Sequence, residues 1–409
     1  MAELWPLLFD RFGLEIAFAH RTFSWGSEAR GAAHVHVVVI GLTHRDAEPA
    51  EKRLFSYPDI RGEPIETRHA ALTAYLFDAK GVANRHLVVR EESRPINGAR
   101  RLKTGVQMID DGILTFTHDE RRAFLEVEPN AESLFRRFLG GDEFINGFHR
   151  WILYLADADP VLLRSLPAVI ARMRALREYR AASNRPSTVA MAAFPERLGV
   201  DERLRSDFLV IPNTSSERRF YVPIGWLGPD VVANQKLRIL PDASLWEFAV
   251  LTSTMHMAWM RSITGRMKSD YMYSVGVVYN TFPWPDATPT QRQKVEALAQ
   301  AVLDARAAHP TASLADLYDP DTMPGDLRRA HQALDLAVDR LYRPQPFASD
   351  RDRVEHLFGR YEKLVDPLAT AGVAANRRTT RRVAREDDEA AQPQSSPFRG
   401  GGPAKPVEG

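Results

Sequence analysis

The apolar positions at the start of the chain change from a helical spacing to a strand spacing. Large apolar residues recur every three or four positions up to Gly13, which predicts a helix over residues 3–13. The alternating stretch LEIAFAHRTF (14–23) and the almost unbroken apolar stretch AHVHVVVIGL (33–42) then predict two strands. The link between them is too short for the crossover of a parallel pair, so we expect antiparallel pairing. Because two strands alone are marginally stable, they are predicted to form the edge of a larger α/β sheet.

The rest of the chain shows other patterns. RHLVVRE (85–91) predicts a strand within a mixed region, and residues 163–185 carry apolar positions at helical spacing. Three further helices are predicted within 290–365. From about residue 366 large apolar residues nearly vanish, so residues 366–409 are expected to form a disordered tail.

Composition narrows the class of protein without naming a partner. The 54 basic and 53 acidic residues give a net charge of +1, so only a local cluster can indicate nucleic acid. The absence of cysteine excludes disulfides, thiol catalysis and thiolate metal sites, and His34 with His36 lack a third ligand, so no metal site is expected. No apolar run reaches the roughly 20 residues that span a bilayer, and no signal peptide is found. We expect a soluble, cytoplasmic protein with no membrane partner.

A helix with arginines on its polar faces is the first indication of a polyanionic partner. Arg172, Arg174, Arg177 and Arg180 are expected to project from the polar faces of the predicted helix 163–185, with Glu178 as the only nearby acid. A solvated helix usually mixes both signs. The stripe therefore favours a polyanionic partner, and a solvated face is the alternative.

Two later stretches combine residue types that contact bases or phosphates. TSSERRFYVPIGW (214–226) brings hydroxyl, carboxylate and guanidinium groups together at Ser215, Ser216, Glu217, Arg218 and Arg219. RSITGRMKSDYMYS (261–274) adds cations between tyrosines, at Arg261, Arg266 and Lys268. Arginine can bind guanine through two hydrogen bonds, and glutamate can accept one from the amino group of cytosine. A salt-bridged turn is the alternative for the first stretch.

The roles of these residues can be divided further. Glu217 and Arg219 are expected to contact base edges, whereas the arginine stripe and Lys268 are expected to contact phosphates. Consecutive side chains of an extended segment point to opposite sides. At most one of Arg218 and Arg219 should therefore face a groove, with a slight preference for Arg219.

Several long stretches carry a resemblance to a known family. They are FAHRTFSWGSEARGAAHVHVVVIGL (18–42), FINGFHRWILYL (144–155), SSERRFYVPIGWL (215–227), STMHMAWMRSITGRMKSDYMYS (253–274), VVYNTFPWP (277–285) and LADLYDPDTMPGDLRRAHQALDLAVDRLY (314–342). Over roughly residues 3–365 the chain resembles the C-terminal half of the MmeI-like, type IIL restriction–modification enzymes. The methyltransferase of this family uses S-adenosylmethionine to modify adenine at its exocyclic amine.

The resemblance implies an architecture and a partner. It implies an α/β edge of a seven-stranded methyltransferase sheet (1–45), a connecting α+β region (46–150), a mixed target-recognition domain (151–285) and a C-terminal helical domain (286–365). Double-stranded DNA is the implied partner. In related enzymes the region just past strand six packs against the flipped target base. Phe23 and Trp25 match that region, and a place in the edge of the sheet core is their alternative.

The chain departs from the family at the donor site. Neither the glycine-rich turn that binds S-adenosylmethionine nor the Asn-Pro-Pro-aromatic turn is found in the sequence. No S-adenosylmethionine is therefore expected to bind this chain alone. We expect the DNA-reading portion of an N6-adenine methyltransferase, inactive by itself, either truncated or completed by a separate chain. A non-catalytic DNA-binding protein or a split-enzyme specificity subunit is the alternative, and a decayed gene product is a third.

Overall fold

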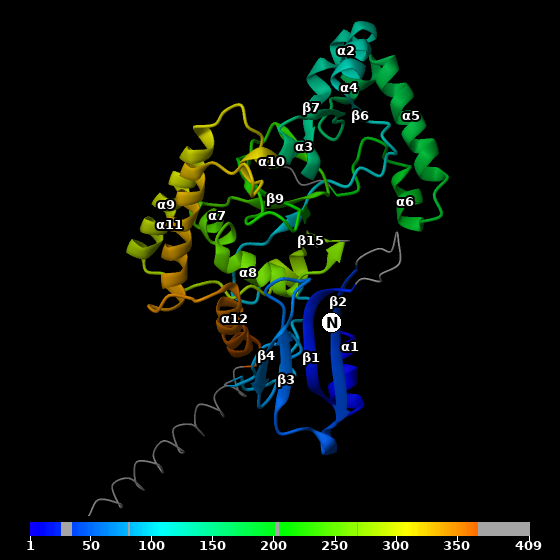
Figure 1. Ribbon diagram of the computed structural model, residues 1–409. Helices are drawn as coiled ribbons and strands as arrows, with labels where there is room; N and C mark the ends of the chain where they lie inside the picture. The colour runs from blue at the N-terminus through cyan, green and yellow to red at the C-terminus, as the bar shows by residue number, and fades with distance from the viewer. Residues whose placement is uncertain (26–34, 81, 201–203, 268, 367–409) are drawn as a thin grey trace, which may run out of the picture.

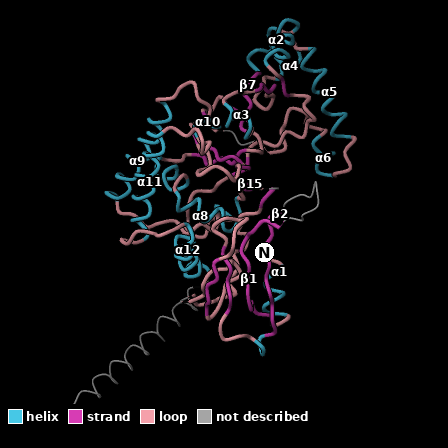
Figure 2. The backbone as a smooth tube through the Cα atoms, viewed as in Figure 1, coloured by secondary structure: helices cyan, strands magenta, loops and turns pink. Residues whose placement is uncertain are grey.

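The computed structural model describes residues 1–366 except 26–34, 81, 201–203 and 268 (Figure 1). Lys268 and residues 367–409 of the expected tail lie outside the described residues. The described chain forms an N-terminal sheet, a central body and an outlying lobe, and long helices run along one side of the body. Figure 2 shows strands at the centre of each of the first three parts and helices toward the outside.

The N-terminal sheet has four strands in the order β2-β1-β3-β4. Its strands are β1 (Leu14–Trp25), β2 (Val35–His44), β3 (Lys52–Ser56) and β4 (Ile65–His69). β1 and β2 pair antiparallel, from Leu14 opposite His44 to Trp25 opposite Val35, as predicted. β3 runs parallel to β1 and β4 antiparallel to β3, so the sheet extends beyond the predicted pair. β2 lies at one edge of this sheet.

The predicted N-terminal helix is formed in two short parts. They are α1 (Leu4–Pro6) and the π-helical turn η1 (Leu7–Arg11). Trp5 and Phe9 are buried with Ile16 and Leu54 in the core of the N-terminal sheet. The apolar face of this helix therefore covers one side of the sheet.

The outlying lobe is built on a second four-stranded sheet, in the order β12-β7-β8-β6. Its strands are β6 (Thr115–Phe116), β7 (Phe135–Leu139), β8 (Arg150–Leu153) and β12 (Val231–Ala233). Its helices are α2 (His118–Val127), α4 (Pro160–Arg164), α5 (Pro167–Ala181) and α6 (Pro186–Met191). The single helix predicted over 163–185 is broken before Pro167, because proline is favoured at the first turn of a new helix. Val169 and Leu176 of α5 are buried in the lobe's core.

The central body contains two more sheets. The first, in the order β11-β9-β13-β5, consists of β5 (Lys103–Thr104), β9 (Phe208–Pro212), β11 (Gly225–Leu227) and β13 (Leu237–Pro241). The second, in the order β10-β15-β14, consists of β10 (Thr214–Ser215), β14 (Arg266–Met267) and β15 (Asp270–Met272). The short helix α3 (Gly141–Asn146) packs next to β9.

The C-terminal helices share one core with the central body. The central helices are α7 (Leu245–Leu251), α8 (Thr254–Ile263) and the π-helical turn η4 (Val275–Tyr279). They are followed by α9 (Pro289–Ala307), α10 (Leu314–Leu317), α11 (Gly325–Tyr342) and α12 (Asp350–Val365). The three predicted helices correspond to α9, α11 and α12. Trp259 of α8 is fully buried against Phe358 of α12, so the two parts form one hydrophobic unit. Among the described residues no helix is long and apolar enough to cross a membrane.

The strand predicted at 85–91 is wrong. This segment pairs with no strand among the described residues, yet Val88 and Val89 are both buried. Val88 lies in the core of the N-terminal sheet, whereas Val89 lies in the core of the central body. The apolar pattern therefore arises because the segment passes between two cores, each of which buries one of the valines.

Candidate nucleic-acid interface

Residues 216–219, here called the SERR turn, form a tight turn directly after β10. Ser215 is buried and lies opposite Tyr271 of β15. The backbone N–H of Arg219 donates to the Ser216 carbonyl at 3.2 Å, and that of Arg218 donates to Ser216 Oγ at 3.3 Å. Ser216 therefore closes the turn, and Glu217 and Arg218 occupy its tip.

Arg266 holds the carboxylate of Glu217. Its Nη1 donates to Oε2 of Glu217 and to the Ser269 carbonyl, both at 3.1 Å. Its Nη2 donates to the Tyr271 hydroxyl at 3.2 Å, and its guanidinium carbon lies 4.3 Å from the centroid of that ring. The Glu217 side chain is still 35% exposed. The carboxylate is thus oriented by a cation and remains open to solvent.

A cleft of about 1160 Å³ separates the SERR turn from the N-terminal sheet. The central body contributes Glu217, Arg218, Arg266, Ser269 and Tyr271 to its lining. The N-terminal sheet and the loop after β3 contribute Thr22, Val35, His36, Val38, Ile60 and Arg61. Glu217, Arg218 and Arg266, which are expected to bind DNA, therefore face the edge strand β2 across one cleft.

The two arginines of the turn have different environments. The Arg218 side chain is 59% exposed and forms an ion pair with Asp321, in the loop before α11. Arg219 is half-buried, and this burial lowers the pKa of its guanidinium, although Asp319 and Asp270 act in the opposite direction. Of the two, Arg218 is the one that lines the cleft, whereas the sequence slightly favours Arg219.

Arg261 uses its guanidinium within the protein. It lies in the last turn of α8, and its Nη1 donates to Oδ2 of Asp350 at 3.0 Å. Its Nη2 donates to the carbonyl of Arg219 at 3.3 Å and to the carbonyl of Phe220. Arg261 therefore supports the end of the SERR turn, which differs from its expected place among the DNA contacts.

Some arginines of α5 are exposed, and others donate hydrogen bonds to backbone carbonyls of the protein. Arg174 and Arg177 are exposed. Arg172 is half-buried: Nη1 donates to a backbone carbonyl of the loop before β6 at 2.9 Å, and its guanidinium carbon lies 4.7 Å from the centroid of Phe116. Arg180, also expected on a polar face, is instead completely buried, because its guanidinium donates to four backbone carbonyls. The expected stripe thus keeps two exposed cations, because Arg172 contributes to the fold of the lobe.

Phe23 and Trp25 lie within β1, not just past its end as expected, and form an aromatic row with Phe55 of β3 and Tyr57 directly after it. The Phe23 ring stacks on Tyr57 at a centroid distance of 4.9 Å, and the Trp25 ring lies 5.9 Å from that of Phe23. His20 continues the row by stacking on Phe55 at 4.2 Å. Trp25 is 58% exposed. The row therefore runs from the half-buried Phe55 to the exposed Trp25.

Sequence reasoning missed two kinds of residue in this region. Phe55 and Tyr57 are two positions apart, which places side chains on one face of an extended segment, so this spacing could have indicated the aromatic row. Asp321 and Asp350 had no such signal. Asp321 lies 103 positions from its partner Arg218, and Asp350 lies 89 positions from its partner Arg261. Only the fold brings each pair together.

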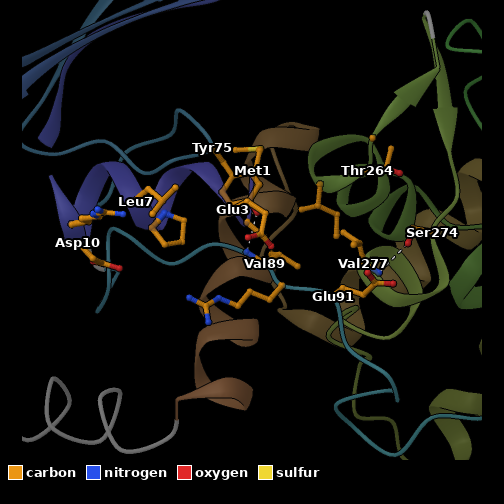
Figure 3. A pocket seen from close by; sticks show the side chains of 16 residues that line it. Met1, Glu3, Leu7, Asp10, Tyr75, Val89, Glu91, Thr264, Ser274 and Val277 are labelled. Carbon is orange, nitrogen blue, oxygen red and sulfur yellow. Dashed lines mark hydrogen bonds between the residues drawn. The ribbon is translucent and has the colours of Figure 1, made fainter. Parts of the chain in front are cut away.

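A second cleft, of about 810 Å³, lies between the N-terminal helical segment and the central body (Figure 3). Leu7 and Asp10 line it near one end, Met1 lies farther along, and Thr264 and Ser274 lie toward the opposite end. Of the residues expected to bind DNA, none of those that the structure describes lines this cleft. Within the described ranges no group of three or more histidine or acidic side chains could hold a metal ion.

Comparisons with known proteins agree with this arrangement. Family models match residues 1–56 (MmeI, DNA-methyltransferase domain), 83–286 (MmeI, target recognition domain) and 287–369 (MmeI, C-terminal domain). DNA methyltransferase A of Bacillus subtilis (strain 168) is 32% identical over 363 residues, which are 89% of this chain and 40% of that protein. The structure of the type IIL restriction–modification enzyme MmeI in complex with DNA is 40% identical, with a TM-score of 0.80 over 89% of this chain and 47% of that one.

The chain thus spans less than half the length of these two relatives. The matched models include the target recognition and C-terminal domains, which agrees with the mixed α+β body and the C-terminal helices. By these matches the chain belongs to the MmeI-like family of type IIL restriction–modification DNA methyltransferases.

Proposed function

We propose that this chain reads DNA sequence for a restriction–modification methyltransferase that modifies adenine at its exocyclic amine. The observation that carries the proposal is the cleft with the SERR turn and Arg266 on one wall and strand β2 on the other. A turn that reads bases must lie near the sheet that receives the flipped target base, because both act on one duplex. The MmeI neighbour was solved in complex with DNA, which supports double-stranded DNA as the partner.

In this proposal the SERR turn contacts base edges. Glu217 accepts a hydrogen bond from a cytosine amino group, and one of Arg218 and Arg219 donates to the paired guanine. Arg266 orients Glu217 before DNA arrives, which reduces the ordering cost of binding. The exposed pair of Arg218 with Asp321 is worth little, so Arg218 can leave it at small cost.

Other residues contact phosphates and fix the register on the duplex. Arg174 and Arg177 suit this role because they are exposed cations on one helix. Lys268 shares the role in our proposal. Arg172 and Arg261 are assigned to support of the protein fold instead, because their guanidinium groups donate to backbone carbonyls.

Phe23 and Trp25 form the outer wall of the pocket for the flipped adenine. A base stacked on an aromatic side chain gains about 1–3 kcal/mol, and the open end of the row at Trp25 offers such a face. S-adenosylmethionine supplies the methyl group in the complete enzyme. The residues of this chain do not fit a donor site, because the sequence has neither the glycine-rich nor the Asn-Pro-Pro-aromatic turn. We therefore assign donor binding to a methyltransferase half outside this sequence, carried on the same or a separate chain.

The proposal is tested by selection from a library of randomised duplexes, followed by a methylation assay with tritiated S-adenosylmethionine. We expect one duplex sequence to be enriched and no tritium in DNA with this chain alone. After the chain is joined to the N-terminal half of a relative, we expect methylation of an adenine within the enriched sequence. A library without enrichment, or methylation of cytosine, would contradict the proposal. Enrichment without methylation by the joined protein would favour a non-catalytic DNA-binding protein.

A further inference from the structure

The end of the SERR turn is connected to the C-terminal helices by alternating charges. Arg261 holds the carbonyls of Arg219 and Phe220 and pairs with Asp350, the first residue of α12. The other oxygen of Asp350 accepts from Nη1 of Arg353 at 3.2 Å. Nη2 of Arg353 then donates to Oδ2 of Asp339, in α11, at 2.6 Å. We call the four side chains Asp339, Arg353, Asp350 and Arg261 the ion-pair relay.

Three of the four side chains of the relay are sheltered from water. Asp339, Arg353 and Arg261 are 7%, 14% and 24% exposed, whereas Asp350 is 46% exposed. Ion pairs that are partly buried are screened by salt much less than surface pairs. The planar guanidinium groups of Arg353 and Arg261 can each bridge two partners in fixed directions. The relay therefore connects α11 and α12, through Arg261, to two backbone carbonyls of the turn segment.

Neighbouring residues of the same segment are anchored on the same helices. The hydroxyl of Tyr221 donates to Oδ2 of Asp335, in α11, at 2.7 Å, and its ring stacks on His331 at 4.1 Å. On the other side, Arg218 pairs with Asp321 in the loop before α11. Contacts to the C-terminal helical region thus flank Arg219 on both sides.

We propose that the C-terminal helices set the position of the SERR turn, and that Arg261 and Asp350 are positioning residues for base recognition. This inference rests on the base-reading role proposed above. Hydrogen bonds to base edges weaken steeply outside a narrow range of distance and angle, so a turn that moves loses discrimination. Phosphate contacts from α5, in the outlying lobe, do not depend on the relay. Breaking the relay should therefore reduce sequence preference and leave the electrostatic part of DNA binding unchanged.

Hydrogen exchange tests the positioning without DNA. Asp350→Asn removes the charge at the centre of the relay, and we expect backbone amides of residues 217–222 to exchange about tenfold faster. Arg261→Lys keeps a cation that can reach one carbonyl, so its effect should be intermediate. Arg351→Gln is the matched control, because Arg351 pairs with Glu355 within α12, and it should leave these amides unchanged. Unchanged exchange in Asp350→Asn would overturn the inference.

Binding to duplexes at several salt concentrations tests the consequence. For Asp350→Asn and Arg261→Ala we expect about a tenfold loss of preference for the selected sequence over random DNA, with the salt slope of the wild-type chain. A slope lower by about 1 for Arg261→Ala would instead make Arg261 a phosphate contact and refute its positioning role. Equal midpoints of urea unfolding for the two variants and the wild-type chain would exclude a general loss of stability as the cause. If the wild-type chain selects no sequence, the proposed base reading fails, while the exchange experiment still decides whether the relay positions the turn.

Discussion

Glu217 and Arg266 form an ion pair of 3.1 Å that connects the SERR turn to β14 at the wall of the larger cleft. Both side chains are more than one third exposed, at 35% for Glu217 and 44% for Arg266. An exposed pair of this kind contributes about 0–1 kcal/mol. The ion pair can therefore orient the Glu217 carboxylate in the free protein, and it can break when a base offers a better hydrogen-bond donor.

Replacement of Glu217 should change which sequence is bound more than how tightly DNA is bound. For Glu217→Ala we expect relaxed preference at one base pair, at a cost of about 1–3 kcal/mol for the preferred duplex. Arg218→Ala and Arg219→Ala, measured in parallel, identify the arginine that reads the paired base. The measurement is enrichment from a randomised duplex library. A uniform loss of affinity with the same preferred sequence would make the turn a structural element.

The arginines of α5 should separate into two classes. Arg174→Ala and Arg177→Ala are expected to weaken binding to all duplexes alike and to lower the salt slope by about 1 each. Arg172→Ala is the matched control, because its guanidinium donates to a backbone carbonyl and lies over Phe116. It should lower the urea midpoint of the chain and leave the slope unchanged. A reduced slope for Arg172→Ala would show that this arginine reaches phosphates after all.

The elements that could be predicted from the sequence are those with local signals. The β1–β2 hairpin follows from a short link between two apolar stretches, and α9, α11 and α12 follow from helical spacing. The strand prediction for residues 85–91 is wrong because Val88 and Val89 are buried in different cores. Burial alone gives a strand-like pattern, whereas a strand also requires a partner for its backbone.

The candidate site was less predictable because it depends on distant residues. Arg172 and Arg174 look alike in the sequence, but the carbonyl that engages Arg172 lies 59 positions away. The buried Arg180 likewise donates to a carbonyl 72 positions away. Local composition indicates a cluster of cations, and only the fold decides which of them remain exposed.

His256 should remain neutral well below the usual titration range of histidine. It is completely buried in α8, its Nε2 lies 2.8 Å from the Tyr273 hydroxyl, and burial lowers its pKa to about 3. The unfolded chain takes up this proton below about pH 6.5 and the folded chain does not. Stability from neutral His256 is therefore complete above pH 6.5 and is lost as the pH falls toward 3.

This expectation is measured as the free energy of unfolding in urea at pH 7 and pH 5. His256→Gln is the comparison, because glutamine can keep a hydrogen bond to Tyr273 but does not titrate. Other titrating groups are shared and largely cancel, so the wild type should lose about 2 kcal/mol more than the variant. An NMR titration in which the His256 ring protonates near pH 6.5 would refute the assignment.

The edge strand β2 should be the site of self-association in this chain. Its outer edge has no strand partner among the described residues, and Val35, Val38 and Leu42 are each more than one third exposed. An open edge with apolar side chains is a template for pairing with another chain. Leu42→Lys, outside the lining of the larger cleft, should reduce aggregation measured by light scattering. Val127→Lys is the matched control, because it replaces an exposed valine of α2 by the same charge without touching an edge strand, and it should have little effect.

Hydrogen exchange tests the open edge directly. In a purified monomer the amides of residues 35–40 that face the open edge should exchange rapidly. Strong protection of all of them would mean that the edge is already covered.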